Sequence, residues 1–163
     1  MLAIKLTACS GRHPAYSEYD YAIPMIVRPA DSSLFGEYEL DEFSYSHVDE
    51  TKVYPRTPIL LTIHPNGLFQ LTNLPDMALG AAGKPMKGQL LNAIGSWSIL
   101  ADTSSSESKG FVPFLGRIAF RFKVGDSSSS LITLCNQLTL RDKQPAILIP
   151  VGAHQKLLFV KKA

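Results

Sequence analysis

The strongest constraint on the fold is a stretch of strict alternation at residues 116–124. One parity holds the apolar side chains, and the other holds three cations and an alanine: Ile118, Phe120, Phe122 and Val124 against Arg117, Ala119, Arg121 and Lys123. Because successive residues of a strand point to opposite faces, this pattern predicts a half-buried strand with one apolar and one cationic face. The apolar face requires a core, and we expect Trp97, Ile99, Ile118, Phe120 and Phe122 to be largely buried.

Length and composition predict a single domain spanning residues 1–163. The chain is 45% hydrophobic and 18% charged, whereas a disordered chain is less apolar and more charged. No apolar run reaches the ~18 residues of a membrane helix, and the N-terminus lacks the basic start and apolar stretch of a signal peptide. We therefore expect a cytoplasmic location. In that compartment Cys9 and Cys135 are expected to be reduced thiols, with Cys135 buried.

Several further segments have the patterns of strands. Residues 59–64 and 68–73 are predicted to form a hairpin, because Pro65-Asn66-Gly67 between them suits a turn with positive φ. Alternation also predicts strands at the remaining candidate segments, which are 2–8, 37–41 with an acidic outer face, 88–102, 146–151 and 156–160. Gly95 is expected to mark a bulge or bend in the long strand 88–102.

Other segments are predicted to be irregular or helical. Pro24 places 21–28 at a sheet edge or bend, 49–58 is expected to be a connector, and a helical turn is expected at 76–79. Residues 127–142 fit two patterns. Leu131, Leu134, Cys135 and Leu138 have helical spacing, while Ile132, Leu134, Leu138 and Leu140 fit a strand. Helix is the favoured interpretation.

The strand count predicts the fold class. We expect a mainly β, single-domain fold, either a β-barrel (OB-like) or a sandwich, of roughly seven to nine strands with one short helix.

Charge is unevenly distributed along the chain. Residues 1–50 hold three basic residues against nine acids, for −6, and the rest holds 13 basic residues against five acids, for +8. Such asymmetry is typical of an anion-binding surface beside an acidic one, or of two segments that pack together and neutralise one another.

Motifs for catalysis and for cofactor or metal binding are absent from the sequence. It has no Gly-x-Ser-x-Gly elbow, no phosphate-binding Gly-rich loop and no His-Glu-x-x-His pair, and its four histidines are scattered. No Cys/His spacing of a structural zinc site occurs. We therefore expect a protein without enzymatic activity, cofactor or metal.

Residues 116–152 resemble the later half of OB-fold single-stranded-DNA-binding proteins. The resemblance rests on the basic-aromatic strand, a predicted short helix, and the segment Lys143-Gln144-Pro145-Ala146-Ile147-Leu148-Ile149. It implies a sheet face that carries cations and aromatic rings to a nucleic acid strand, and it implies a barrel.

The residues themselves favour the same ligand. A groove for single-stranded nucleic acid needs cations spaced along the phosphates. The candidate binding residues are the three cations of the strand and three lysines near it in sequence: Arg117, Arg121, Lys123, Lys84, Lys87 and Lys109. The leading hypothesis is a non-enzymatic module that binds single-stranded nucleic acid. The alternatives are a protein-interaction or assembly subunit that uses the acidic segment 31–50, and a strand face that is only solvated.

Overall fold

The computed structural model describes residues 22–82, 87–101, 114–124, 131–151 and 155–163. These contain nine strands, two α-helices and one 3₁₀ helix. The first half comprises β1 (Ile23–Pro24), α1 (Asp31–Leu34), β2 (Gly36–Leu40), α2 (Glu42–Glu50), β3 (Leu60–Ile63), β4 (Leu68–Pro75) and the 3₁₀ helix η1 (Asp76–Ala82). The second half comprises β5 (Leu90–Ala101), β6 (Phe114–Lys123), β7 (Leu131–Arg141), β8 (Gln144–Pro150) and β9 (Lys156–Lys161). The strand expected at 2–8 lies outside the described residues.

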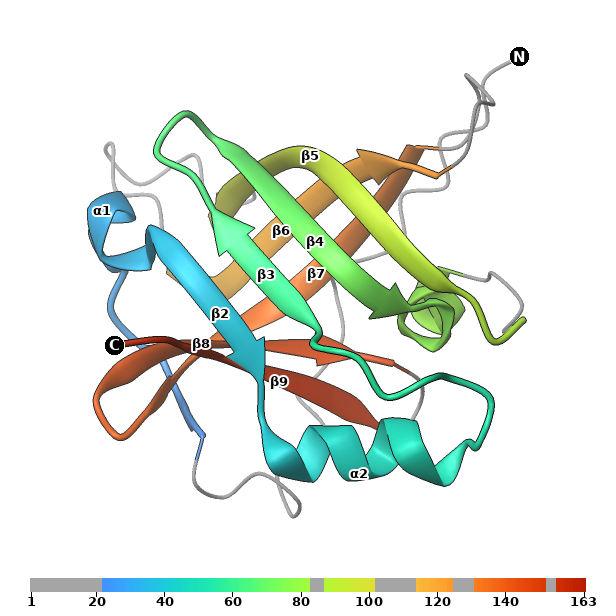
Figure 1. The fold of residues 1–163 in the computed structure, drawn as a ribbon. Helices are drawn as coiled ribbons and strands as arrows, with labels where there is room; N and C mark the ends of the chain where they lie inside the picture. The colour runs from blue at the N-terminus through green and yellow to red at the C-terminus, as the bar shows by residue number, and fades with distance from the viewer. Residues whose placement is uncertain (1–21, 83–86, 102–113, 125–130, 152–154) are drawn as a thin grey trace.

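Strands β2 to β9 form a closed antiparallel barrel. Each pairs with the next along the chain, and β9 pairs with β2 to complete the ring (Figure 1). Strand β1 is a ninth strand outside the ring, paired with β7. The prediction of a mainly β, single-domain fold is thus confirmed, and of the two expected architectures, barrel and sandwich, the chain forms the barrel. A closed ring leaves no free sheet edge within it, which explains how so apolar a set of strands stays paired internally.

The barrel interior is filled with side chains. Ile118, Phe120 and Phe122 of β6 point inward and are at most 2% exposed. The ring of Phe69 lies 4.6 Å from that of Phe120, which is an arrangement typical of packed aromatic pairs. Trp97 is also buried, so four of the five expected core residues are confirmed, while Ile99 is only partly buried.

The hairpin predicted from the Asn-Gly turn is confirmed. Strand β3 pairs with β4 from Leu60 opposite Thr72 to Ile63 opposite Phe69. Gly67 has φ +77°, and a Cβ added there would meet nothing within 4 Å. Its positive φ, and not a lack of space, is the reason that glycine suits this position, because glycine adopts the left-handed backbone at little cost.

The helix expected within 127–142 is not formed, because residues 131–141 are strand β7. One edge of β7 pairs with β6 and the other with β8, so backbone pairing on both edges overrides the local helical spacing. Leu134 and Leu138 point into the barrel, as the strand pattern requires. The helix that the resemblance to OB-fold proteins includes is therefore absent from the described residues 131–151.

Helix α2 was not expected, since residues 49–58 were interpreted as a connector and 42–48 had no assignment. Asp41 begins it as an N-cap, with its Oδ1 accepting a hydrogen bond from the Ser44 N–H at 2.8 Å. Tyr45 and Val48 form its buried face. The predicted helical turn at 76–79 is confirmed, because η1 begins at Asp76.

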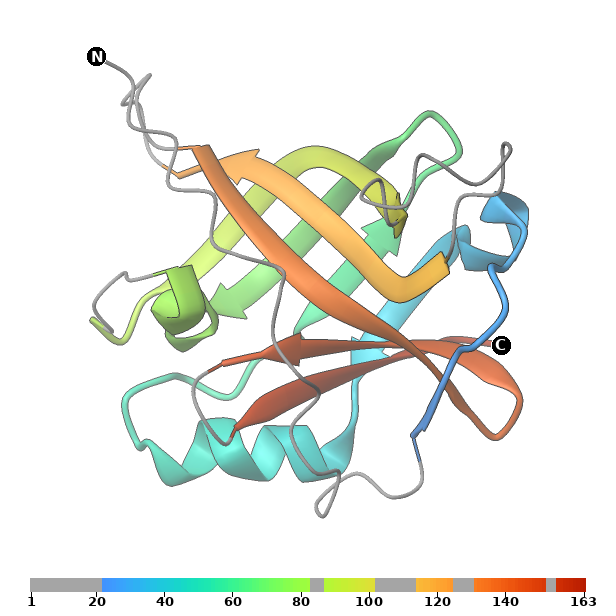
Figure 2. The same ribbon diagram turned by 180° about the vertical axis from the view of Figure 1, so that it is seen from behind.

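Strand β5 has no bulge at Gly95. Strand β5 pairs with β4 over Leu90–Ser96 and with β6 over Gly95–Ala101. Its first half is therefore paired mainly with β4 and its second half mainly with β6. The pairing is regular at Gly95, and the register shifts occur elsewhere, between Ile99 and Ala101 on β5 and between Leu71 and Leu74 on β4. Figure 2 shows the curved wall made by β5, β6 and β7.

The two ends of the barrel are covered by different elements. Strand β2 runs from α1 to α2, so these helices lie at opposite ends (Figure 1). The β3–β4 turn, the β7–β8 turn and the end of β9 lie at the α1 end, because alternate strands reverse direction. Among the described residues, no helix has the length and apolar character needed to span a bilayer.

The expectation of a reduced, buried Cys135 is wrong. Cys135 is disulfide-bonded and only partly buried, and the described part of the chain holds no free cysteine. Its neighbours Leu134 and Asn136 point into the barrel, so Cys135 lies on the outer side of β7, where a bond partner can reach it. Cys9 lies outside the described residues. The expected reduced state followed from the expected cytoplasmic location, whereas disulfides persist mainly in oxidising compartments.

Candidate functional site

The basic residues of β6 lie on the outer side of the barrel wall. Because Ile118, Phe120 and Phe122 point inward, Arg117, Arg121 and Lys123 point outward by alternation. Their exposure is unequal, since Lys123 is exposed while both arginines are partly buried.

Contacts on this face limit how much of it meets solvent. Arg121 Nη1 donates to Ser98 Oγ on β5 at 2.8 Å, and Ala119 between the two arginines is fully buried. The aromatic rings of β6 lie inside the barrel, so they do not form a stacking surface for bases beside these cations.

Of the three lysines that are near β6 in sequence, the structure describes Lys87, which lies away from this basic face. Lys87 follows η1, at the α2 end, where β5 begins. Its backbone N–H donates to Asp76 Oδ2 at 2.8 Å. Lys84 and Lys109 lie outside the described residues. The structure thus places three of the six candidate residues on one strand face and one elsewhere.

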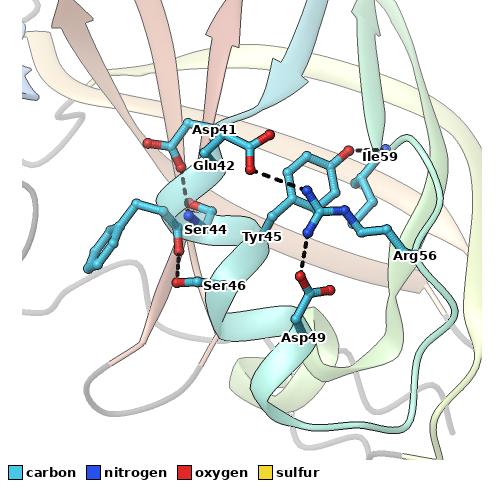
Figure 3. Close-up of polar contacts among 9 residues, drawn as sticks. Asp41, Glu42, Ser44, Tyr45, Ser46, Asp49, Arg56 and Ile59 are labelled. Atoms are coloured by element: carbon cyan, nitrogen blue, oxygen red, sulfur yellow. Dashed lines mark hydrogen bonds and ion pairs between the residues drawn. The ribbon is translucent and has the colours of Figure 1, made fainter.

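The acidic segment 31–50 is neutralised largely by the protein itself. Six of its seven carboxylates lie within 4.0 Å of an arginine or lysine, and Glu50 lies 3.9 Å from His47 Nδ1. Arg56 binds both Glu42 and Asp49 across α2, and its guanidinium stacks 4.3 Å from the centre of the Tyr45 ring (Figure 3). Exposed pairs of this kind add little stability, but they leave little uncompensated negative charge.

Three of these pairs join distant parts of the chain. Arg141 of β7 lies 3.2 Å from Asp41 Oδ2, and Lys162 lies beside Glu37 and Glu39 on the outer face of β2. The acidic outer face predicted for 37–41 is therefore present at Glu37 and Glu39. Asp41 is buried and caps α2. The uneven charge along the chain is explained, in this region, by segments that pack together and neutralise one another.

A groove opens at the α1 end of the barrel, between the segment that contains β1 and the β7–β8 hairpin. Its volume is about 750 Å³. Most of its lining is apolar, with the main contributions from Ile23, Met25, Ile26, Val27, Leu140 and Pro145. Figure 2 shows the blue segment that carries β1 passing beside the hairpin.

The sheet register explains how distant segments meet in this groove. Ile23 pairs with Leu140, and Leu140 pairs with Pro145, so these side chains share one face of three neighbouring strands. Lys161 of β9 continues the row, one residue beyond the pair of Ala146 and Val160. Leu138 and Phe159, two residues before Leu140 and Lys161, are core residues, so the row lies on the inward-facing side at the open end of the barrel.

The polar part of the groove lining is cationic. Lys143 and Lys161 line it together with Ser33 and Gln144. Lys161 Nζ donates to the carbonyl oxygen of Ser33 at 2.8 Å, which holds this ammonium beside α1. Lys143 is exposed, with φ 66° in the tight β7–β8 turn. Among the described residues, neither lysine belongs to a salt bridge.

The edge segment 21–28 was predicted from the sequence, but the groove was not. The apolar residues Ile23, Ile26 and Val27 remain 63%, 88% and 74% exposed, which is unusual for a cluster of three large aliphatic side chains. Their signal in the sequence is the apolar run from Ala22 to Val27, which has no strand alternation. The lysines carried no such signal, because they reach the groove only through strand pairing.

A second buried polar site lies at the α2 end. Tyr54 Oη donates to Asp76 Oδ1 at 2.6 Å, and the Met77 N–H donates to Tyr54 Oη at 3.0 Å. Burial disfavours the Asp76 carboxylate, but hydrogen bonds from Tyr54 and from the backbone N–H of Lys87 and its neighbours outweigh it and lower the pKa of Asp76.

Tyr54 titrates in the opposite direction. Burial and the hydrogen bond to Asp76 raise the pKa of Tyr54. The pair joins the loop after α2 to η1 and to the start of β5, which is a structural role.

Within the described residues, no three His, Cys, Asp or Glu side chains are placed to hold a metal ion. No family model, curated protein or solved structure matches the chain.

Proposed function

We propose that this protein is a non-enzymatic binding module that takes a small apolar or amphipathic molecule in the groove at the α1 end. The observation that carries the proposal is a cavity of about 750 Å³ at a barrel mouth whose lining is mainly aliphatic. Barrel mouths are a recurrent position for ligand sites, and sites for small molecules commonly measure ~300–1,000 Å³. The rest of the barrel interior supports this position, because it is filled by the aromatic core.

The test is a titration with a neutral apolar fluorophore such as N-phenyl-1-naphthylamine. Trp97, the only tryptophan, lies at the same end of the barrel, with its indole N–H bonded to the His64 carbonyl at 3.1 Å. It can therefore report binding by energy transfer to the probe. We expect saturable binding to one site.

Variants that place charge in the groove locate the site. Ile26→Asp with Val27→Asp should weaken probe binding about tenfold, because two aliphatic contacts are lost. Both side chains are exposed, so the fold should be retained. Ile94→Asp is the matched control, since Ile94 is 69% exposed on β5 and lies outside the groove lining. No saturable binding, or equal weakening in the control, would overturn the proposal.

The outer face of β6 supports a second proposal, which is binding of single-stranded nucleic acid. The supporting observation is that Arg117, Arg121 and Lys123 share one outward face. Cations on alternate residues of a strand are about 6–7 Å apart, which resembles the spacing of phosphates along an extended chain. The groove has the better support because its shape, its apolar lining and its two lysines, which form no salt bridge with a described residue, agree with one another.

A further inference from the structure

We infer that the ligand of the groove is a free single-chain carboxylate, with its apolar chain along the β1 segment and its carboxylate beside Lys143 and Lys161. This inference rests on the proposed function and specifies the ligand class. The groove combines two features that an amphipathic anion matches: a long aliphatic wall and a cationic end.

The two lysines supply the head-group site. An ammonium has three N–H donors, and Lys161 uses one of them on the Ser33 carbonyl, which fixes its position and leaves two for a ligand. Lys143 and Asp142 have φ 66° and 49°, so the two-residue turn sets the direction in which Lys143 leaves the hairpin. Asp142 is exposed in the same turn and forms no salt bridge with either lysine.

The aliphatic wall of the groove supplies the site for the apolar chain of the ligand. Ile23, Leu140 and Pro145 lie in one row that leads to Lys161. A ligand whose head group lies at Lys161 would therefore extend its chain along this row toward β1. Ile26 and Val27 border the same groove with most of their surface exposed, and a bound chain would cover them.

Three other occupants fit less well. An extended peptide would need backbone donors along the β1 segment, but Pro24 and Pro29 have none. An anionic membrane surface is typically bound by clusters of about four to eight basic residues, whereas two lysines line this groove. A second copy of this chain would bring like-charged lysines together.

The experiment compares ligands that share one chain and differ in charge. Dodecanoate, 1-dodecanol and dodecyltrimethylammonium displace the neutral fluorophore, and we expect dodecanoate to bind about five- to twentyfold more tightly than the alcohol, and the cation to bind most weakly. Shortening dodecanoate to decanoate should weaken binding about fourfold per methylene removed. The advantage of dodecanoate over the alcohol should shrink in high salt.

Variants assign the head-group site. Lys143→Gln should weaken dodecanoate binding about two- to fivefold and leave dodecanol unchanged. Lys161→Gln should do the same, and the double variant should bind both ligands alike. Lys52→Gln is the matched control, because Lys52 is also exposed with positive φ (56°) but lies next to α2. Far-ultraviolet circular dichroism of each variant shows that the fold is retained.

The outcomes separate the two proposals. If the neutral fluorophore does not bind, the proposed function fails. If it binds while dodecanol and dodecanoate compete equally in the wild type, only the carboxylate inference is overturned. Binding to anionic vesicles without displacement by free dodecanoate would assign the groove to a membrane surface and overturn the inference. A dimer dissociated by Ile26→Asp with Val27→Asp would assign it to a second copy, with the same consequence.

Discussion

Replacing Gly95 by alanine should destabilise the barrel by about 2–4 kcal/mol. A Cβ at this position would lie 2.0 Å from the Arg121 carbonyl oxygen and 2.9 Å from the Phe122 Cβ. Real Cβ contacts essentially never fall below 3.0 Å, so β5 and β6 must separate by about 1 Å. The obstacle is a backbone atom in the middle of a paired strand, which no side-chain rotation can relieve.

The magnitude combines three contributions. Overpacking a dense core costs ~1–3 kcal/mol, and we take the upper part of this range, ~2–3 kcal/mol, because the obstacle is a backbone atom; a weakened backbone hydrogen bond costs ~0.5–1.5 kcal/mol. Against these, alanine restricts the unfolded chain and returns ~0.4–1 kcal/mol. For a domain of this size the net loss corresponds to a decrease in Tm of roughly 5–15 °C.

Urea unfolding followed by circular dichroism measures the effect. Trp97 fluorescence is a second probe, and coincidence of the two transitions tests two-state behaviour. Gly67→Ala is the control, because its Cβ would meet open space and the cost, about 1 kcal/mol, comes from positive φ alone. A Gly95→Ala variant as stable as Gly67→Ala would refute the argument from close approach.

Three further predictions concern the core, the buried carboxylate and the basic face. Phe120→Ala should cost ~3–5 kcal/mol in urea unfolding, because a fully buried ring packed on Phe69 is lost; a cost below 1 kcal/mol would show that the site collapses freely. Asp76→Asn should cost ~1–3 kcal/mol at pH 7, because the amide presents a donor to the backbone N–H groups. The folded pKa of Asp76 is lowered, so its stabilisation is complete above the ordinary value of 3.8 and is lost as pH falls through the folded pKa. The difference between wild type and Asp76→Asn should therefore shrink when unfolding is measured at pH 3 instead of pH 7, and a constant difference would contradict the assignment. If β6 binds oligonucleotides, Arg121→Ala should weaken all sequences similarly and lower the salt slope by about one phosphate, and no binding of wild type at low salt would exclude this function.

The sequence predicted correctly those elements whose structure is decided by neighbouring residues alone. Strand β6 alternates without exception, and Asn66-Gly67 specifies its turn by backbone conformation, so both were found from the sequence. Strand β7 was not, because Leu134 and Leu138 satisfy helical and strand spacing equally. Asn136 also interrupts the apolar alternation, since it is a polar side chain that is 1% exposed inside the barrel. Only pairing with β6 and β8 decides between the two structures.

The candidate groove is a feature that could not be predicted from the sequence. Its aliphatic wall comes from residues 23–29 and from the β7–β8 hairpin, and Lys161 comes from the end of β9. These segments are far apart in sequence, and their meeting depends on the order and register of four strands. The apolar run at 22–27 is visible in the sequence, but its meeting with the lysines is not, whereas the basic strand is a local pattern that the sequence shows directly.

The way β1 is attached has a consequence for how such a groove could change over time. Two residues pair β1 with β7, and one further hydrogen bond joins the Met25 N–H to the Leu138 carbonyl, while the ring of eight strands closes without it. Because this backbone pairing is short, we expect the amides of β1 to exchange with solvent before those of the ring. Substitutions at the exposed residues Ile23, Ile26 and Val27 should reshape the opening with little effect on the unfolding of the barrel. A scaffold of this kind can acquire new ligands without risking its own folding.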